Sequence, residues 1–413
     1  MFSFLKNSVF GIISIGSRLL SSFFLNKIVA WYFGPAGIVQ LAHFQNLVTF
    51  ITLVPNDGIN RGIIKYLAGA SKQSPQFQTY FTAGFYLTLA LFLGITTVLV
   101  SARTYFLPYF PASISWLGWL IGGTLFLVLQ SFFNAVLLAH QKTGKLILAN
   151  IFSAIAVVSY VTWAAGKLPI TSFLIGYLLV MGIVGLSTIP VSLQGLPKKQ
   201  LFAFRVSGLA VQALSKYVLM AASVLLFTKG LEYYIRDYLI RHFSMEQTGL
   251  WQGVVRISDS YTALYAAVLA FAFYPKVAAL LSQEHKLHVF VQQTLLLLIP
   301  GILTGLSLVY ILQEYVFTWL LSARFKAAGI FLPFQLAGDF CKLLSWLLAN
   351  LLVAQSKFKI AIAFEAISAL FYFGFFHFFT SIYQMAGSPM AHFAHYLIFL
   401  LLNLFYFRKL LTA

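Results

Sequence analysis

Long apolar runs separated by short polar interruptions recur from one end of the chain to the other. A helix of about 20 residues crosses about 30 Å of hydrocarbon, because each residue adds about 1.5 Å. The runs predict twelve membrane-spanning helices: Ser8 to Phe33, Gln40 to Tyr66, Tyr80 to Ser101, Ser113 to Ala139, Leu146 to Ala165, Thr171 to Leu193, Ser207 to Phe227, Thr248 to Phe273, Phe290 to Leu312, Ile330 to Ala354, Ile360 to Tyr383 and Pro389 to Phe407. We therefore expect an all-α, polytopic membrane protein.

The predicted helices form two groups of six that carry similar sequence steps. A Gly-x-x-Gln step enters the second helix of each group, as Gly37 with Gln40 and Gly249 with Gln252, at an offset of 212 residues. A glutamine and a lysine four residues later open the fifth and eleventh helices at an offset of 214: Gln141 with Lys145, and Gln355 with Lys359. This repetition predicts two lobes, residues 1–194 and 207–413, joined by a cytoplasmic linker at 195–206 and related by a pseudo-two-fold axis near the membrane normal.

Basic residues are unevenly divided between the two sides of these helices. The side that holds both termini carries Lys6, Lys65, Lys72, Lys142, Lys145, Lys198, Lys199, Arg205, Lys276, Lys286, Lys357, Lys359, Arg408 and Lys409. The other side carries Arg103, Lys167, Lys229, Arg236, Arg241, Arg324 and Lys326, and its longest connection is Thr228 to Gln247. Positive loops stay in the cytoplasm, so we predict that both termini are cytoplasmic, in the inner membrane of a bacterium.

Composition narrows the class of protein further. Of 413 residues, 60% are apolar and 9% are charged, whereas soluble domains have about 25% charged residues. The net charge of +18 is spread among apolar spans, so we expect no nucleic-acid partner. A single cysteine, Cys341, excludes an internal disulfide. The first apolar run contains Arg18 and Lys27 and is too long for a signal peptide, so we expect it to be retained.

Several charged residues fall inside the predicted spans, where each costs a few kcal/mol. The cations are Arg18, Lys27, Arg61, Lys216, Arg256 and Lys342, and the acids are Asp57, Asp259, Asp339 and Glu365. Three opposite-charge pairs have helical spacing: Asp57 with Arg61, Arg256 with Asp259, and Asp339 with Lys342. Such pairs either neutralise each other for insertion or face a water-filled cavity.

The unpaired cations favour a cavity. Arg18 and Lys216 each follow a serine and lie about 15 Å into the opening helix of their group, near the membrane midplane. Lys27 lies near Trp31 and Tyr32, so the alternative for it is an interfacial position. Together Arg18, Lys27, Arg61, Lys216 and Arg256 predict an anion-binding cavity suited to a pyrophosphate group. The alternative is pairing with acids on other helices.

Signatures of catalysis are absent from the sequence. There is no G-x-x-x-x-G-K-[ST] phosphate loop, so we expect no ATP hydrolysis, no cofactor and energy from an ion gradient. Asp259, Asp339 and Glu365 are candidate proton carriers. The pairs His285 with His288 and His392 with His395 lack nearby acidic or cysteine ligands, so we expect no metal site.

Five short stretches resemble one family, in order and spacing: Phe33 to Gly37, Lys65 with Tyr66, Trp251 to Gly253, Ile257 to Asp259, and Gly338 with Asp339 and Lys342. The chain resembles the Wzx-type oligosaccharide-lipid flippases of the multidrug, oligosaccharidyl-lipid and polysaccharide exporter superfamily. The resemblance implies two six-helix lobes, alternating access, and an undecaprenyl-pyrophosphate-linked oligosaccharide as cargo. The cargo would serve O-antigen, enterobacterial common antigen or related surface polysaccharide assembly.

The resemblance also bears on single residues and on partners. Lys27, Asp259, Asp339, Lys342 and Glu365 match like residues of a family member. Arg18 falls where that relative has a lysine, and Arg256 falls where it has a serine. The resemblance implies a periplasmic polymerase and a chain-length regulator as partner proteins.

Three other classes of protein fit the composition less well. A multidrug or cation antiporter of the same superfamily would prefer an acidic cavity, whereas this chain has an excess of intramembrane cations. A membrane glycan polymerase or ligase would need a long periplasmic loop, and the predicted loops are short. A purely structural membrane subunit would have no use for unpaired midplane cations.

Overall fold

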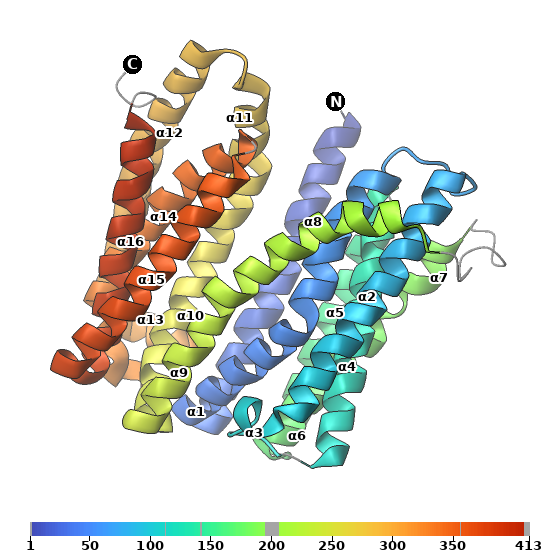
Figure 1. Cartoon of the computed structure of the whole chain (residues 1–413). Coiled ribbons are helices and arrows are strands. Elements are labelled where there is room, and N and C mark those ends of the chain that lie inside the picture. Colours follow the sequence, from blue (N-terminus) through green and yellow to red (C-terminus); the bar gives the residue numbers. More distant parts are fainter. Residues whose placement is uncertain (1, 112, 141–142, 195–205, 356, 409–413) are drawn as a thin grey trace. The chain divides into compact units, whose positions relative to one another are not determined.

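The computed structural model describes residues 2–111, 113–140, 143–194, 206–355 and 357–408 (Figure 1). Every regular element among these residues is helical, which confirms the predicted all-α membrane protein. The elements are α1 (Phe2–Leu67), α2 (Pro75–Ser101), α3 (Arg103–Phe106), α4 (Ile114–Ala139), α5 (Thr143–Ala164), α6 (Ile170–Gly185), α7 (Thr188–Leu193), α8 (Gly208–Val224), η1 (Leu225–Gly230), α9 (Leu231–His242), α10 (Met245–Val268), η2 (Leu269–Phe273), α11 (Tyr274–Leu280), α12 (Glu284–Ile311), α13 (Gln313–Leu320), η3 (Ala323–Phe331), α14 (Leu332–Ala354), α15 (Phe358–Tyr383), η4 (Gln384–Ala386) and α16 (Gly387–Tyr406).

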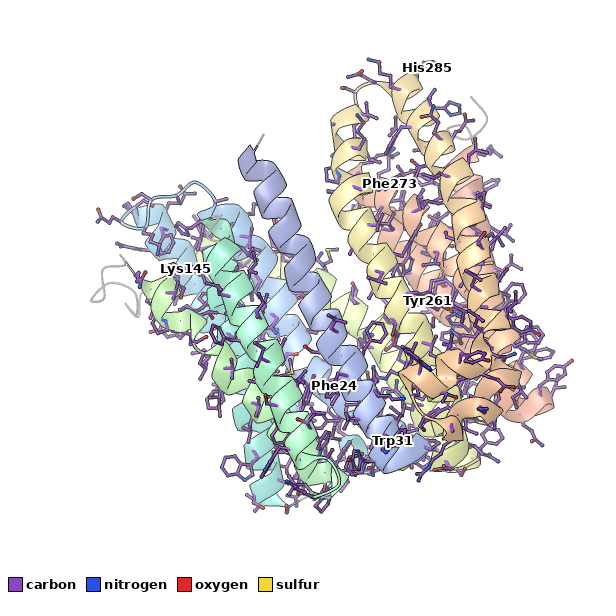
Figure 2. All side chains as sticks on the ribbon, turned by 180° about the vertical axis from the view of Figure 1, so that it is seen from behind. Phe24, Trp31, Lys145, Tyr261, Phe273 and His285 are labelled. Atoms are coloured by element: carbon purple, nitrogen blue, oxygen red, sulfur yellow. The ribbon has the colours of Figure 1, made fainter. Side chains whose placement is uncertain are left out.

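The helices account for the twelve predicted spans. Within the described residues, 9 segments are long and apolar enough to cross a membrane. Two of them, Leu20–Leu67 and Lys359–Tyr406, are 48 residues long, which is more than twice the length that about 30 Å of hydrocarbon requires. Each is interrupted by a residue with positive φ, Gly34 in one and Gln384 in the other, and so supplies two spans. The remaining predicted span coincides with α10 and η2, along which Tyr261 and Phe273 lie (Figure 2).

Capping serines, prolines and a glycine determine where several helices begin or break. Ser74 caps α2 by accepting a hydrogen bond from the backbone N–H of Phe77, and Pro75 opens the helix. A serine directly before the first helical residue accepts a hydrogen bond from a backbone N–H group that has no partner within the helix. Ser113 and Ser244 cap α4 and α10 in the same way. At Gly34 the backbone has φ 65 and ψ −162, a conformation that glycine adopts at little cost, and Pro35 follows directly.

The contacts group the chain into two compact units. Unit 1 comprises residues 1–28 and 40–230, and unit 2 comprises residues 29–39 and 231–413. In unit 1, α4 packs along α6 and α5 along α6. The second half of α1 shares a core with α2, α4 and α8, built from Ile59, Ile63, Phe77, Phe81, Phe132, Phe133 and Leu214. Aromatic rings dominate this core, and Phe81 and Phe132 meet edge to face at 5.4 Å between centroids.

Unit 2 is built around α14 and α16, which run side by side (Figure 1). Its core includes Phe273, Val291, Cys341, Leu347 and Leu400. Cys341 is buried there among leucines. Residues 29–39 of α1 also pack in this unit: the hydroxyl of Ser322 donates to the carbonyl of Ala30, 3.3 Å away, and the backbone of Pro35 lies against Gly249.

These units differ in extent from the predicted lobes. The helix α8 and the π-helical turn η1 group with unit 1, whereas the predicted boundary precedes them. The predicted linker at 195–206 lies outside the described residues except for its last residue, as do Gln141, Lys142 and Lys409. The division into lobes of residues 1–194 and 207–413, and the duplication behind it, therefore stay predictions.

One predicted connection proved to be a helix. Residues Thr228 to Gln247 were expected to form a loop, but α9 covers most of this segment. The burial of one face of α9 explains the difference, because Ile235, Arg236 and Leu239 are buried at helical spacing. Elsewhere on α9, Arg241 and Asp237 form a surface ion pair of 2.8 Å. Arg236, expected in a loop, is therefore part of the interior of unit 2.

The close approach of Gly249 to Pro35 yields a stability prediction. A methyl group at Gly249 would collide with the Pro35 backbone, which cannot rotate away, whereas Gly305 in α12 has open space at its Cβ position. We expect Gly249→Ala to lower the free energy of unfolding by about 1–3 kcal/mol, and the control Gly305→Ala to be neutral or slightly stabilising. Thermal unfolding of both purified variants in detergent measures this difference. Equal midpoints for the two variants would contradict the contact.

Candidate functional site

Two of the predicted anion-binding cations lie on one face of unit 1. Arg61 extends from the second half of α1 toward α8, where its Nη1 lies 3.8 Å from the sulfur of Met220. Lys216 precedes Met220 by one helical turn on α8, so it shares this face. Both cations are exposed although they lie inside membrane-spanning segments. The sequence prediction that Arg61 and Lys216 act at one site is thus compatible with their positions.

Two glycines bring the helices that carry these cations together. Gly58 lies against the backbone and side chain of Val218, and Gly62 lies against Leu214 and Tyr217. Small residues four apart allow two helix backbones to approach closely within a membrane. The close packing of α1 on α8 therefore fixes the spacing of Arg61 and Lys216.

The other charged residues that the sequence predicted in unit 1 are Asp57, Lys27 and Arg18. Asp57 is exposed one turn before Arg61, whose described contact is Met220 and not the Asp57 carboxylate. Lys27 is half-buried on the first half of α1. The backbone of Arg18 is helical, but its side chain lies outside the described residues.

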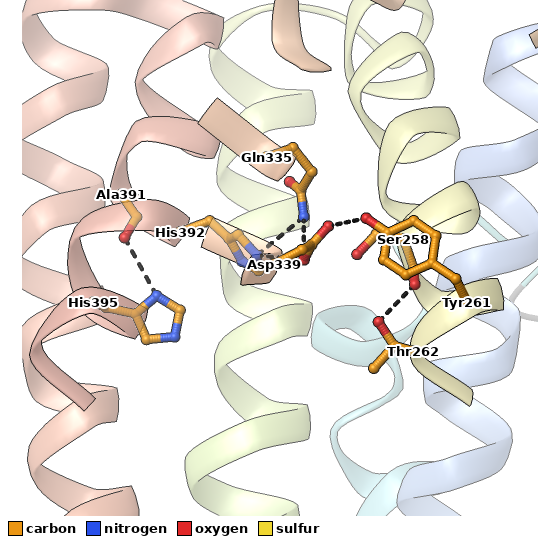
Figure 3. Close-up of polar contacts among 8 residues, drawn as sticks. All are labelled: Ser258, Tyr261, Thr262, Gln335, Asp339, Ala391, His392 and His395. Carbon is orange, nitrogen blue, oxygen red and sulfur yellow. Dashed lines mark hydrogen bonds and ion pairs between the residues drawn. The ribbon is translucent and has the colours of Figure 1, made fainter. Parts of the chain in front are cut away.

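Unit 2 contains a buried polar cluster around Asp339 (Figure 3). The Asp339 side chain is fully buried, and its Oδ1 lies 3.0 Å from His392 Nε2. The amide of Gln335 donates to the same oxygen at 3.3 Å and lies 3.1 Å from His392 Nε2. The hydroxyl of Tyr261 donates to the other oxygen, Oδ2. Three partners from α10, α14 and α16 thus offset the cost of burying this carboxylate.

Lys342 has a different environment from the one predicted. The sequence paired it with Asp339 at a spacing of three residues, but its ammonium lies over the rings of Trp346 and Tyr396, 5.1 and 5.8 Å from their centroids. Aromatic faces attract a desolvated cation. Lys342 is 8% exposed, so it balances the charge of Asp339 within the same interior without touching the carboxylate.

A second buried contact joins α9 to α10. The Nε of Arg236 donates to the Oε1 of Gln252 at 2.8 Å, and the two residues are 5% and 1% exposed. Arg256 is half-buried on α10, one turn beyond Gln252, and Asp259 is exposed. Glu365 on α15 is exposed as well. Of the three predicted proton carriers, Asp339 is therefore the one in a built polar environment.

The two histidines of α16 occupy distinct positions. His392 faces Asp339, whereas the His395 ring stacks on Tyr372 with 4.1 Å between centroids and lies 3.3 Å from the Ala391 carbonyl. Within the part of the chain that the structure describes, no three histidine, cysteine or acidic side chains come together as metal ligands would.

Sequence reasoning missed several members of these clusters. Gln335 lies four residues before Asp339 on the face of α14 that also carries Lys342. This helical spacing could have indicated Gln335 from the sequence. His392 was noted only for a metal pair. Tyr261 and the contact of Arg236 with Gln252 depend on how separate helices pack, and no local pattern indicates them.

The chain is similar in sequence to curated flippases. The chain is 25% identical over 406 residues to the lipid III flippase of Escherichia coli (strain K12), a match that covers 94% of the chain and 93% of the relative. The lipid III flippase of Shigella flexneri matches equally. No family model matches the chain.

Solved structures with this fold are transporters. An inward-facing multidrug resistance MATE family transporter of the MOP superfamily superposes with a TM-score of 0.76 at 11% identity, covering 95% of this chain and 94% of that one. The lipid II flippase MurJ in an inward closed conformation gives 0.75 at 12% identity, covering 98% and 87%. The proteins that the chain resembles are thus transporters. This confirms the prediction of a transporter and not an enzyme. The chain is a multi-pass membrane protein with the fold of MOP-superfamily transporters, and it is similar over nearly its whole length to lipid III flippases.

Proposed function

We propose that this protein is a flippase that carries an undecaprenyl-pyrophosphate-linked oligosaccharide from the cytoplasmic to the periplasmic leaflet of a bacterial inner membrane. The observation that carries the proposal is the similarity to lipid III flippases across 94% of the chain. The fold similarity to a lipid II flippase supports the same substrate class. The glycan would serve enterobacterial common antigen, O-antigen or a related surface polysaccharide, with a polymerase and a chain-length regulator as partners.

The exposed cations of unit 1 supply the binding chemistry. A guanidinium or ammonium group facing hydrocarbon costs a few kcal/mol, so exposed cations at membrane depth belong in a water-filled space. Arg61 and Lys216 on their shared face would bind the pyrophosphate, the guanidinium through two parallel hydrogen bonds to phosphate oxygens. Arg18 and Lys27, on the first part of α1, remain proposed members of this site, and Arg256 of unit 2 remains a separate proposed ligand of the substrate.

Multidrug transport is the second candidate, because MATE transporters share the fold. The charges favour the flippase, since Arg61 and Lys216 would repel a cationic drug and attract a pyrophosphate. Transport itself requires two conformations. MATE transporters of this fold have been solved in inward-facing and outward-facing forms, which supports alternating access for this chain. The excess of basic residues on the side of the termini supports a cytoplasmic position for both termini, and the proton gradient is the proposed energy source.

Depleting the protein in its host tests the substrate class. We expect a polyprenyl-pyrophosphate glycan to accumulate on the cytoplasmic leaflet, because its synthesis continues while its export stops. Mass spectrometry of extracted lipids identifies the glycan, and the protection of the glycan from an externally added lectin in spheroplasts gives its sidedness. An unchanged lipid pool would contradict the proposal and direct attention to drug efflux.

Removing the two cations of unit 1 tests the pyrophosphate site. We expect Arg61→Ala combined with Lys216→Ala to reduce glycan export at least about tenfold, because a hydrogen bond to a charged group contributes about 1.5–3 kcal/mol. Lys167→Ala is the matched control, since it removes an exposed cation of unit 1 that lies over the Trp163 ring, after the end of α5. Export is measured by surface polysaccharide at equal protein levels. Normal export by the double variant would exclude these cations from the site.

The contact between Ser322 and Ala30 tests alternating access. Residues 29–39 belong to α1 but group with unit 2, whereas the rest of α1 groups with unit 1, and we propose that the contact of Ala30 with Ser322 parts during transport. Ala30→Cys with Ser322→Cys, oxidised to a disulfide across the contact, should stop export, and reduction should restore it. Each single variant under the same oxidation and reduction is the control for native Cys341. Full export by the crosslinked protein would show that the contact is permanent.

A further inference from the structure

Three polar atoms in the interior of unit 2 converge on one position. Asp339 Oδ1 lies 3.0 Å from His392 Nε2, Gln335 Nε2 lies 3.1 Å from His392 Nε2, and Gln335 Nε2 lies 3.3 Å from Asp339 Oδ1. The carboxylate oxygen is an acceptor, and the imidazole nitrogen is an acceptor or a donor according to its protonation. The contact of His392 with Asp339 therefore needs either a proton between the two atoms or a donor that serves both.

The cluster provides both arrangements. A ring proton on His392 Nε2 donates directly to Asp339 Oδ1, in the neutral Nε2–H tautomer as well as in the imidazolium, where the hydrogen bond is charge-assisted. When Nε2 carries no proton, the Gln335 amide is the donor within reach of both acceptors. The buried carboxylate therefore faces the imidazole in each protonation state, and it stabilises the ring when a second proton makes it a cation.

Burial gives the proton a direction of approach. The side chain of His392 is 13% exposed, whereas that of Asp339 is 0% exposed. The imidazole is thus the group that a proton reaches first, and Asp339 stabilises the cation once it forms. Tyr261 holds the second carboxylate oxygen, which keeps Oδ1 directed at His392.

The surrounding charged and titratable groups do not occupy this contact. Lys342 of α14 lies over aromatic rings. The rings of His395 and Tyr396 of α16 are tilted against each other with 4.0 Å between centroids, and Tyr372 of α15 stacks on His395. At longer range, Glu232 and Arg236 of α9 act on Tyr372, and Asp259 and Glu365 act on Tyr396. Asp339 Oδ1 therefore has His392 as its partner from outside α14, at hydrogen-bond distance.

We propose that His392 and Asp339, with Gln335 as the alternate donor, form the proton-binding site that couples transport to the proton gradient. This inference rests on the proposed flippase function and assigns its energy coupling to residues outside the cationic face of unit 1. Asp259 and Glu365, the other predicted carriers, are exposed and take no part in this three-residue arrangement.

Leaflet distribution at equilibrium tests the coupling. The purified protein is reconstituted into vesicles with the glycan lipid that accumulates in depleted cells, and a gradient of one pH unit is imposed. One proton per cycle then shifts the ratio of glycan between leaflets about tenfold, because one pH unit corresponds to about 1.4 kcal/mol. We expect this shift with the wild-type protein and with His395→Gln, the matched control one turn further along α16. His392→Gln keeps an N–H donor for Asp339 but binds no proton, so its ratio should remain near one.

The outcomes separate this inference from the proposed function. Absence of any movement of glycan by the wild-type protein, with or without a gradient, would overturn the flippase itself. Movement by the wild-type protein without a shift in its leaflet ratio, or a full shift in His392→Gln, would overturn the proton site alone.

A direct measurement covers the case in which the His392 variant does not fold. Nitrogen-15 spectra of histidine-labelled wild-type protein in nanodiscs report the protonation of each imidazole, and the spectrum of Gln335→Asn identifies the His392 signal by its displacement. We expect the His392 signal to change from the neutral to the protonated form of the ring as the pH of the nanodiscs is lowered. A His392 signal that is constant across the pH series would overturn the proposal.

Discussion

The cost of placing charge in hydrocarbon is the constraint on which the rest of this structure depends. Helices satisfy every backbone group internally, so twelve of them form readily from apolar sequence. Charged side chains have no such automatic partner. The protein meets the cost in two ways: it buries Asp339 among hydrogen-bond donors in unit 2, and it leaves Arg61 and Lys216 exposed on unit 1. The first arrangement suits a proton and the second suits an anion.

Sequence was sufficient for the helices because hydrophobic length is a strong local signal. All twelve predicted spans coincide with helices, and glycine followed by proline at residues 34 and 35 marks the break in α1. The segment before α10 was misjudged because α9 mixes charges with apolar residues, and only packing shows that Arg236 points inward. The sequence of a short segment that mixes charged and apolar residues does not indicate which of its faces is buried.

The charged residues were found from sequence, but their partners were not. Spacing correctly listed Asp339 and Lys342, yet helical neighbours need not pair when better partners lie on adjacent helices. His392 is 53 residues from Asp339 and Tyr261 is 78 residues away. Arg61 likewise contacts Met220, which lies 159 residues further along the chain, and not Asp57 one turn before it. Contacts over such separations follow from the tertiary fold alone.

The central claim is that this protein moves a pyrophosphate-linked glycan lipid between leaflets. Purified protein in vesicles that contain the glycan lipid accumulated by depleted cells, placed in one leaflet and read by the access of an external lectin, measures that movement directly. We predict that lectin access changes within minutes when the protein is present and remains constant in protein-free vesicles. Identical lectin access in the two preparations would contradict the account.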